Sequence, residues 1–99
     1  MVTLEKLIWL ITSDDDYVSL GQLEAEAGDL DESTITTLCG EIERGLREGR
    51  IRIGQVGGAT FFPYDVSIES LLARVGRALV QDARARDYHD IWFDIVDPE

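Results

Sequence analysis

Apolar residues near the start of the chain recur at the spacing of an amphipathic helix. A first helix is predicted over residues 3 to 12, and its apolar face consists of Leu4, Leu7, Ile8 and Ile11. Ser19 and Gln22 have the spacing of a capping box, which predicts a second helix over residues 20 to 27. Gly28 is expected to end that helix as its left-handed cap.

A longer third helix is predicted over residues 32 to 48, capped by Asp31 or Ser33. Its apolar face consists of Ile35, Leu38, Ile42 and Leu46. Gly40 and Gly45 lie inside this helix, where each glycine costs about 1 kcal/mol relative to alanine. We expect both glycines to allow close packing of the first helix.

The pattern then changes to the alternation of a strand. Ile51 and Ile53 alternate with arginines, and Gly57-Gly58 supplies the positive dihedral angles of a two-residue hairpin turn. The return strand ends at Pro63, which has no backbone N–H to donate. This strand is therefore predicted to be short or to lie at an edge of the sheet.

Two further elements complete the pattern. Ser67 is predicted to cap a fourth helix, whose apolar face consists of Ile68, Leu71, Leu72, Val75 and Leu79. In the tail, the apolar side chains of Ile91, Phe93 and Ile95 alternate with their neighbours. The tail is therefore predicted to form a final strand or extended segment that covers the hairpin or a helix face.

This order of elements resembles the winged helix-turn-helix architecture from residue 3 to about residue 80. The turn at residues 28 to 31, the helix ending in LREGRI and the wing around Gly57-Gly58 carry the resemblance. It implies an α+β fold with three N-terminal helices, a β-hairpin wing, a fourth helix and a C-terminal strand or extended tail. With 99 residues, we expect the chain to form one domain over residues 1 to 99.

The charge of the chain is strongly negative and unevenly distributed. The formal net charge is −11. Residues 1 to 43 hold eleven acids and one base, residues 44 to 86 hold eight arginines and four acids, and residues 87 to 99 hold five acids. An acidic field of this kind keeps a small protein in solution or steers it towards a basic partner.

The position of the acids argues against DNA binding. In DNA-binding members of the winged architecture, the start of the third helix meets base edges. Here that start holds Asp29, Asp31 and Glu32, which a polyanion would repel. The basic residues come later and are expected to pair with glutamates at helical spacing; they are Arg44, Arg47, Arg50 and Arg52. Nucleic acid is therefore not an expected partner of this chain alone.

No residue pattern indicates catalysis or a bound cofactor. The chain has one cysteine, Cys39, and one histidine, His89, fifty residues apart, so neither a catalytic pair nor a zinc site is indicated. The acids around Asp29 lack the central glycine and closing glutamate of a calcium loop. We expect no enzyme activity, no metal and no cofactor. The N-terminus has no signal-peptide pattern and its apolar run is too short to cross a membrane, so we expect a cytoplasmic protein.

In size, acidity and element order the chain resembles the small immunity proteins encoded beside bacterial polymorphic or contact-dependent toxins. The resemblance implies stoichiometric inhibition of a basic toxin, most simply a nuclease, by occlusion of its active or substrate-binding face. The expected partner-binding acids are Asp14, Asp15, Asp16, Glu24, Glu26, Asp29, Asp31 and Glu32. Tyr17 and Trp92 are candidate aromatic anchors. A core role for the tail aromatics is the other interpretation.

Two other functions stay open. The first is a winged-helix transcription factor or antitoxin-like regulator, in which a dimer gathers the four arginines into one basic stripe. The second is a scaffold module of a larger complex. The oligomeric state is not predicted by the sequence.

Overall fold

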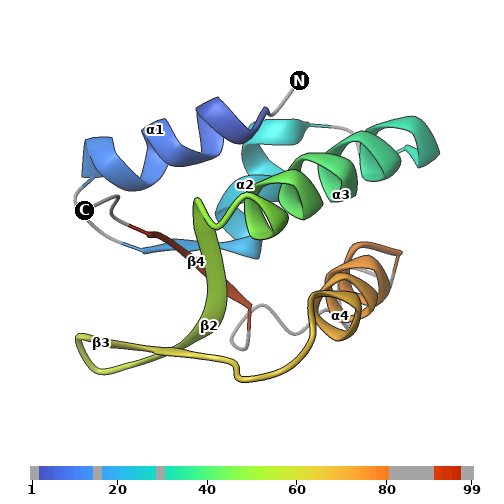
Figure 1. The fold of residues 1–99 in the computed structure, drawn as a ribbon. Coiled ribbons are helices and arrows are strands. Elements are labelled where there is room, and N and C mark those ends of the chain that lie inside the picture. The colour runs from blue at the N-terminus through green and yellow to red at the C-terminus, as the bar shows by residue number, and fades with distance from the viewer. Residues whose placement is uncertain (1–2, 15–16, 29–30, 81–90, 97–99) are drawn as a thin grey trace.

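The computed structural model describes residues 3–14, 17–28, 31–80 and 91–96, except for the side chains of Asp14 and Val80. Within them, four helices accompany a four-stranded antiparallel sheet (Figure 1). The helices are α1 (Leu4–Asp14), α2 (Leu20–Ala27), α3 (Glu32–Arg47) and α4 (Ile68–Val80). The strands are β1 (Val18–Ser19), β2 (Ile51–Gly57), β3 (Thr60–Pro63) and β4 (Trp92–Ile95). The predicted α+β class is confirmed.

The C-terminal strand lies inside the sheet. The strand order is β1-β4-β2-β3, and all neighbours are antiparallel. Val18 of β1 lies opposite Phe93, and Phe93 lies opposite Ile53 of β2. The predicted final strand is thus confirmed. The prediction that it covers the hairpin or a helix face is wrong, because the strand pairs with β1 and β2 within the sheet. Burial explains this position, because Phe93 of the strand and Ile91 just before it are almost fully buried.

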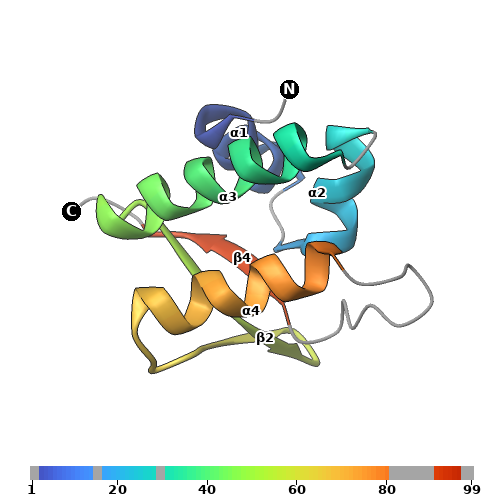
Figure 2. The same cartoon turned by 90° about the vertical axis from the view of Figure 1, so that its right-hand side faces the viewer.

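One hydrophobic core joins the helices to the sheet. Figure 2 shows α4 in front of the sheet. Helix α3 runs alongside α4, and α1 lies behind α3. Every described helix and the strands β1, β2 and β4 contribute buried side chains. The largest of these are Phe93, Leu4, Leu7, Leu20, Leu23, Ile42, Ile53, Leu79 and Ile91. The predicted helical periodicities therefore identify the core faces correctly.

The helix caps follow the sequence signals closely. The Ser19 side chain accepts a hydrogen bond from the Gln22 backbone N–H at 3.2 Å, and the Gln22 side chain accepts one from the Ser19 N–H at 2.8 Å. This confirms the capping box. Of the two candidates for the α3 cap, the structure selects Asp31. Ser67 Oγ accepts from the Ser70 N–H at 3.1 Å, as expected before α4.

The C-terminal cap of α2 differs from the prediction. Gly28 has a φ of 80° with a ψ of −130°, which lies outside the left-handed helical region. Its N–H still donates to the Glu24 carbonyl oxygen at 3.1 Å. Glycine is needed here because this backbone conformation is strained for residues that carry a Cβ.

The hairpin turn lies one residue later than predicted. Gly57 pairs with Thr60, so the two turn residues are Gly58 and Ala59, and only Gly58, with a φ of 62°, has the positive angle. Gly57 belongs to β2, where the Phe62 ring would lie 3.2 Å from an added Cβ. Strand β3 ends at Pro63 and lies at the edge of the sheet, as expected.

Candidate partner-binding surfaces

Three of the predicted partner-binding acids lie on the two sides of the α2–α3 connection. Glu26 is near the end of α2, and Asp31 and Glu32 begin α3. All three are exposed. We call this group the acidic corner; in Figure 1 it lies where α2 leads into α3. The corner is the part of the predicted acidic surface that the structure shows.

Of the other predicted acids, one is buried and the rest have side chains outside the described residues. Glu24 is only 7% exposed, so its placement on an exposed acidic surface was wrong. It lies one residue after Leu23 on the face of α2 that packs into the core. The side chain of Asp14 lies outside the described residues, as do Asp15, Asp16 and Asp29.

The Asp31 carboxylate has a structural role as well as a charge. Its Oδ1 accepts a hydrogen bond from the Thr34 backbone N–H at 2.7 Å. Hydrogen bonds from the backbone and side chain of Thr34 hold the pKa of Asp31 below its ordinary value of 3.8. Asp31 is therefore ionised at neutral pH and is fixed at the N-terminus of α3, where a negative charge is favourable.

The first arginine of α3 connects this helix to α1. Arg44 Nη2 lies 3.1 Å from Glu5 Oε2, and Arg44 Nε lies 3.1 Å from Glu41 Oε2. Hydrogen bonds to Glu41 and then to Glu5 raise the pKa of Arg44 above its ordinary value. Its guanidinium is thus shared between two carboxylates.

Arg47 makes the corresponding connection to α4. Its Nε lies 2.7 Å from Glu43 Oε2 within the helix, and its Nη2 lies 3.3 Å from Glu69 Oε1. Hydrogen bonds to Glu43 and then to Glu69 raise the pKa of Arg47. These pairs are solvent-exposed, so each contributes little to stability. Their larger consequence is that they neutralise the arginines.

The next two arginines are paired as well. Arg50 Nη1 lies 3.8 Å from Glu48 Oε1. Arg52 on β2 donates two hydrogen bonds to Asp94 Oδ2 on β4, from Nε at 3.0 Å and from Nη2 at 2.6 Å. The expected pairing with glutamates at helical spacing is therefore confirmed for Arg44 and Arg47. Arg50 instead pairs with a glutamate two residues away, after the end of α3, and Arg52 pairs with an aspartate of the C-terminal strand.

Aromatic side chains occupy the sheet face turned away from the core. The Tyr17 and Phe61 rings lie 5.1 Å apart at an angle of 31°, and the Arg52 guanidinium lies 4.9 Å from the Phe61 ring centroid. The Phe61 ring lies against Gly54, where an added Cβ would be 2.8 Å from Cζ and would also clash with the Phe62 carbonyl oxygen. Gly54 therefore makes room for the ring.

Both predicted anchors lie on this aromatic face. Trp92 pairs with Gly54 of β2 and with Ser19 of β1, so its side chain shares the Gly54 side of the sheet. Trp92 and Tyr17 are each half-buried. Phe93 points into the core instead, which confirms the core interpretation for this residue, while an anchor role of Trp92 stays a prediction. Sequence reasoning missed Phe61 and Gly54, because no local signal distinguishes them from other hairpin residues.

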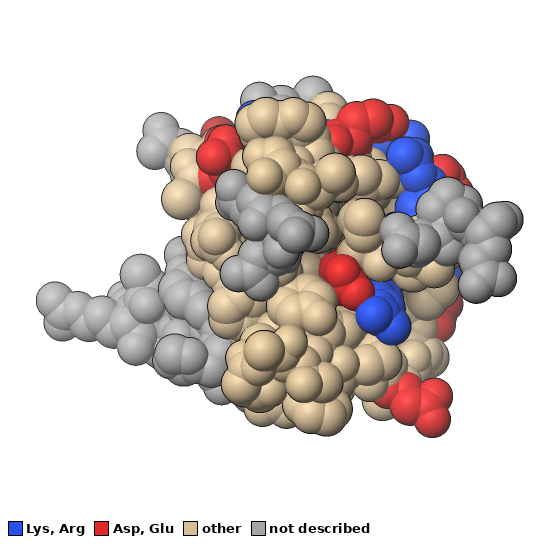
Figure 3. Space-filling model, turned by 90° about the vertical axis from the view of Figure 1, so that its left-hand side faces the viewer, with Lys and Arg blue, Asp and Glu red and all other residues tan. Residues whose placement is uncertain are grey.

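The acidic corner and the aromatic face lie on different elements: the corner on α2 and the start of α3, the aromatic face on the sheet. In Figure 1, β1 begins at the left of the molecule and α3 begins at the right. Figure 3 views the left side, and the described surface there is mainly uncharged, with few acidic and basic groups. The predicted partner-binding residues thus lie on two different sets of elements, the helices α2 and α3 and the sheet.

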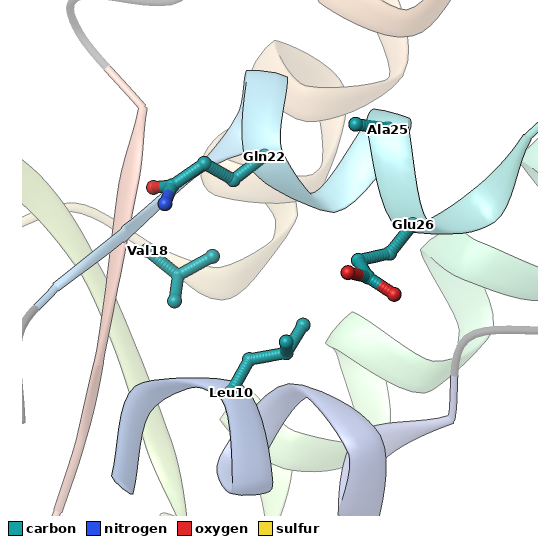
Figure 4. A pocket seen from close by; sticks show the side chains of 5 residues that line it. All are labelled: Leu10, Val18, Gln22, Ala25 and Glu26. Carbon is teal, nitrogen blue, oxygen red and sulfur yellow. The ribbon is translucent and has the colours of Figure 1, made fainter. Parts of the chain in front are cut away.

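A small pocket lies beside the acidic corner. It has a volume of about 210 Å³ and is bounded by α1, β1 and α2 (Figure 4). Its lining residues are Leu10, Val18, Gln22, Ala25 and Glu26. Apart from Glu26, none of them was expected to form a site, because a pocket between elements leaves no signal in the spacing of residues along either element.

The one cysteine, Cys39, lies partly buried in α3. Burial raises the pKa of Cys39 above its ordinary value, which keeps the thiol protonated and weakly nucleophilic. Among the described residues, no group of three His, Cys, Asp or Glu side chains is placed to hold a metal ion. None of the described helices is long and apolar enough to cross a membrane.

Comparisons with protein-family models, with curated proteins and with solved structures gave no match.

Proposed function

We propose that this chain is an acidic binding protein that inhibits a basic partner, most simply an immunity protein that neutralises a toxin nuclease. Its mechanism is occlusion: the chain covers the active or substrate-binding face of the partner in a one-to-one complex. No covalent chemistry is required of this chain. The proposal places the protein in the cytoplasm of the cell that makes the toxin.

The distribution of ion pairs is the observation that carries the proposal. Arg44, Arg47, Arg50 and Arg52 all bind carboxylates of this chain, so their charges are compensated. Within the described residues, the acidic corner takes part in no ion pair of its own. The corner therefore retains the uncompensated negative charge that steers a basic partner and speeds association.

The order of the described elements supports a winged helix-turn-helix-like description of the scaffold. Three helices precede the β2–β3 hairpin and a fourth helix follows it, as the resemblance implies. The strand β4 between β1 and β2 is an addition to that pattern. In our proposal this scaffold presents α2 and the start of α3 to a protein partner.

The arginine pairs also weigh against the alternative of a DNA-binding regulator. A phosphate backbone would have to compete with six carboxylates for the four guanidinium groups. Each new contact with a phosphate would break an existing ion pair. It would therefore add less binding free energy than a contact made by an unpaired arginine, which releases a counterion from the nucleic acid without that loss. For this reason we favour the inhibitor over the DNA-binding regulator.

The decisive experiment is co-purification with the product of the neighbouring gene at low and moderate salt. We expect a one-to-one complex that tightens at low salt, and we expect any nuclease activity of the partner to disappear in the complex. A neighbouring product that does not bind, or that remains fully active when bound, would contradict the proposal. Salt-dependent binding of DNA by this chain would favour the regulator instead.

A charge reversal locates the surface within that complex. Glu32→Lys should slow association several-fold and weaken its salt dependence, because steering acts mainly on the association rate. Asp65→Lys is the matched control, since Asp65 is an exposed acid just before α4 and changes the net charge equally. Equal effects of the two variants on stopped-flow association rates would remove the acidic corner from the interface.

A further inference from the structure

We propose that the pocket between α1 and α2 is an anchor site for one basic side chain, a lysine or arginine of the partner. The pocket combines an apolar wall with one carboxylate at its rim. That combination matches a side chain with an aliphatic stem and a cationic head. The identity of the protein that supplies the side chain rests on the proposed function, whereas binding of a cationic side chain by the pocket does not.

The apolar wall comes from three different elements. Leu10 of α1, Val18 of β1 and Ala25 of α2 face the same space in Figure 4. Val18 is almost fully buried and lies opposite Phe93 in the sheet, so this part of the wall is held by the core. Such a surface favours the methylene groups of a long side chain, which bury well along apolar walls while the charged end stays hydrated.

Glu26 provides the charge. Its carboxylate is exposed and points towards the pocket in Figure 4. Within the described residues, Glu26 has no ion pair, in contrast to Glu41 and Glu43 on α3. The carboxylate is therefore available to a cationic group that enters from solvent.

The opposite rim is held in place by the capping box. The Gln22 side chain accepts a hydrogen bond from the Ser19 N–H at 2.8 Å, which fixes its orientation beside the pocket. A ligand therefore does not have to order this side chain on binding. Such preorganisation reduces the entropic cost of binding.

The size of the pocket selects a side chain over a metabolite. Its volume is about 210 Å³, whereas sites for small-molecule ligands usually measure about 300–1,000 Å³. One carboxylate and one amide already engaged in the capping box also give little basis for recognising a cofactor. A single protruding side chain from a larger protein partner fits both the small volume and the few polar groups of the rim.

Side-chain analogues test the pocket without the partner. We would titrate the ¹⁵N-labelled protein with butylguanidinium and butylammonium, which mimic arginine and lysine, and with the neutral isostere butylurea. At least one cation should shift the amide signals of Gln22, Ala25 and Glu26 with a dissociation constant in the millimolar range. Butylurea should bind more weakly, and the better cation identifies which side chain the site prefers.

Two variants separate the pocket from the general acidic field. Ala25→Leu fills the pocket from an exposed helix position and should abolish the shifts, whereas Ala73→Leu, at an exposed position of α4, should leave them unchanged. Glu26→Gln should weaken cation binding about two- to fivefold, the range of an exposed ion pair. Glu32→Gln removes the same charge from outside the pocket lining and should have a smaller effect.

The proposal is overturned if the amide shifts persist in Ala25→Leu, if butylurea binds as well as both cations, or if no analogue shifts the pocket amides. Failure of the proposed function gives a different result. In that case the analogues bind the pocket, but no basic partner forms a complex. If a complex forms and Ala25→Leu leaves its affinity unchanged, the inhibitor proposal stands and the anchor site is wrong.

Discussion

Gly45 and Gly40 lie in the same helix but have different structural roles. A Cβ added to Gly45 would lie 2.7 Å from Leu4 Cδ1 and 2.8 Å from Ile51 Cγ1, and both side chains are buried. A Cβ at Gly40 would meet nothing within 4 Å. Close packing of α1 against α3 is therefore confirmed as the reason for Gly45, and the same reason is wrong for Gly40.

The two glycines form a matched pair of test positions. Gly45→Ala should lower the free energy of unfolding by about 1 kcal/mol, because overpacking of about 1–3 kcal/mol exceeds the gain in helix propensity. Gly40→Ala should raise it by about 0.5–1 kcal/mol, because only the gain in propensity remains. Urea unfolding followed by circular dichroism measures both. Stabilisation by Gly45→Ala would show that Leu4 and Ile51 move aside freely.

At the scale of the element, α3 is held at both ends by charge. Asp31 caps its N-terminus, and the arginines of its last turns bind α1 through Glu5 and α4 through Glu69. Hydrogen bonds to its own backbone N–H and then to Arg44 lower the pKa of Glu5, and the same arrangement with Arg47 lowers that of Glu69. These carboxylates are stabilising only in their ionised form.

The lowered pKa of Asp31 predicts how stability depends on pH. Because the folded-state pKa lies below the ordinary value of 3.8, the contribution of Asp31 is present above that value. It is lost as the pH falls through the folded-state pKa. In urea unfolding at a series of pH values, Asp31→Asn should show a smaller loss of stability on acidification, because asparagine caps without titrating. Identical acid profiles would contradict this assignment.

At the scale of the whole molecule, the negative charge exceeds what the arginines compensate. The formal net charge is −11, and ion pairs within the chain already involve Arg44, Arg47, Arg50 and Arg52. The remaining acids repel each other, and this repulsion opposes folding. A basic partner would relieve the same repulsion, so inhibitor binding and stability are linked.

Salt should therefore stabilise this protein, although it weakens the individual ion pairs. We expect the free energy of unfolding to rise between about 0.01 M and 0.15 M ionic strength, where the Debye length falls from about 30 to 8 Å. A triple variant, Glu26→Gln with Glu32→Gln and Asp65→Asn, should show a smaller rise because it removes three negative charges. A fall in stability with salt would show that the ion pairs dominate over the repulsion.

The local features of the fold could be predicted from the sequence. The periodicity of Leu4, Leu7 and Ile11, the Ser19–Gln22 capping box and the cap at Asp31 each depend on residues within one or two helical turns. Such signals are readable because helix geometry fixes which neighbours meet. The strong excess of acids is likewise a property of composition alone.

Only the tertiary structure decided the remaining features, because they depend on contacts between distant segments. Strand β4 enters the sheet beside β2, so Arg52 meets Asp94 across 42 positions of sequence. The pocket that Glu26 lines follows from how α1 and β1 pack against α2, and the burial of Glu24 likewise depends on tertiary packing around α2. Sequence spacing sets the faces of each element, but the packing of elements sets which residues remain exposed to bind a partner.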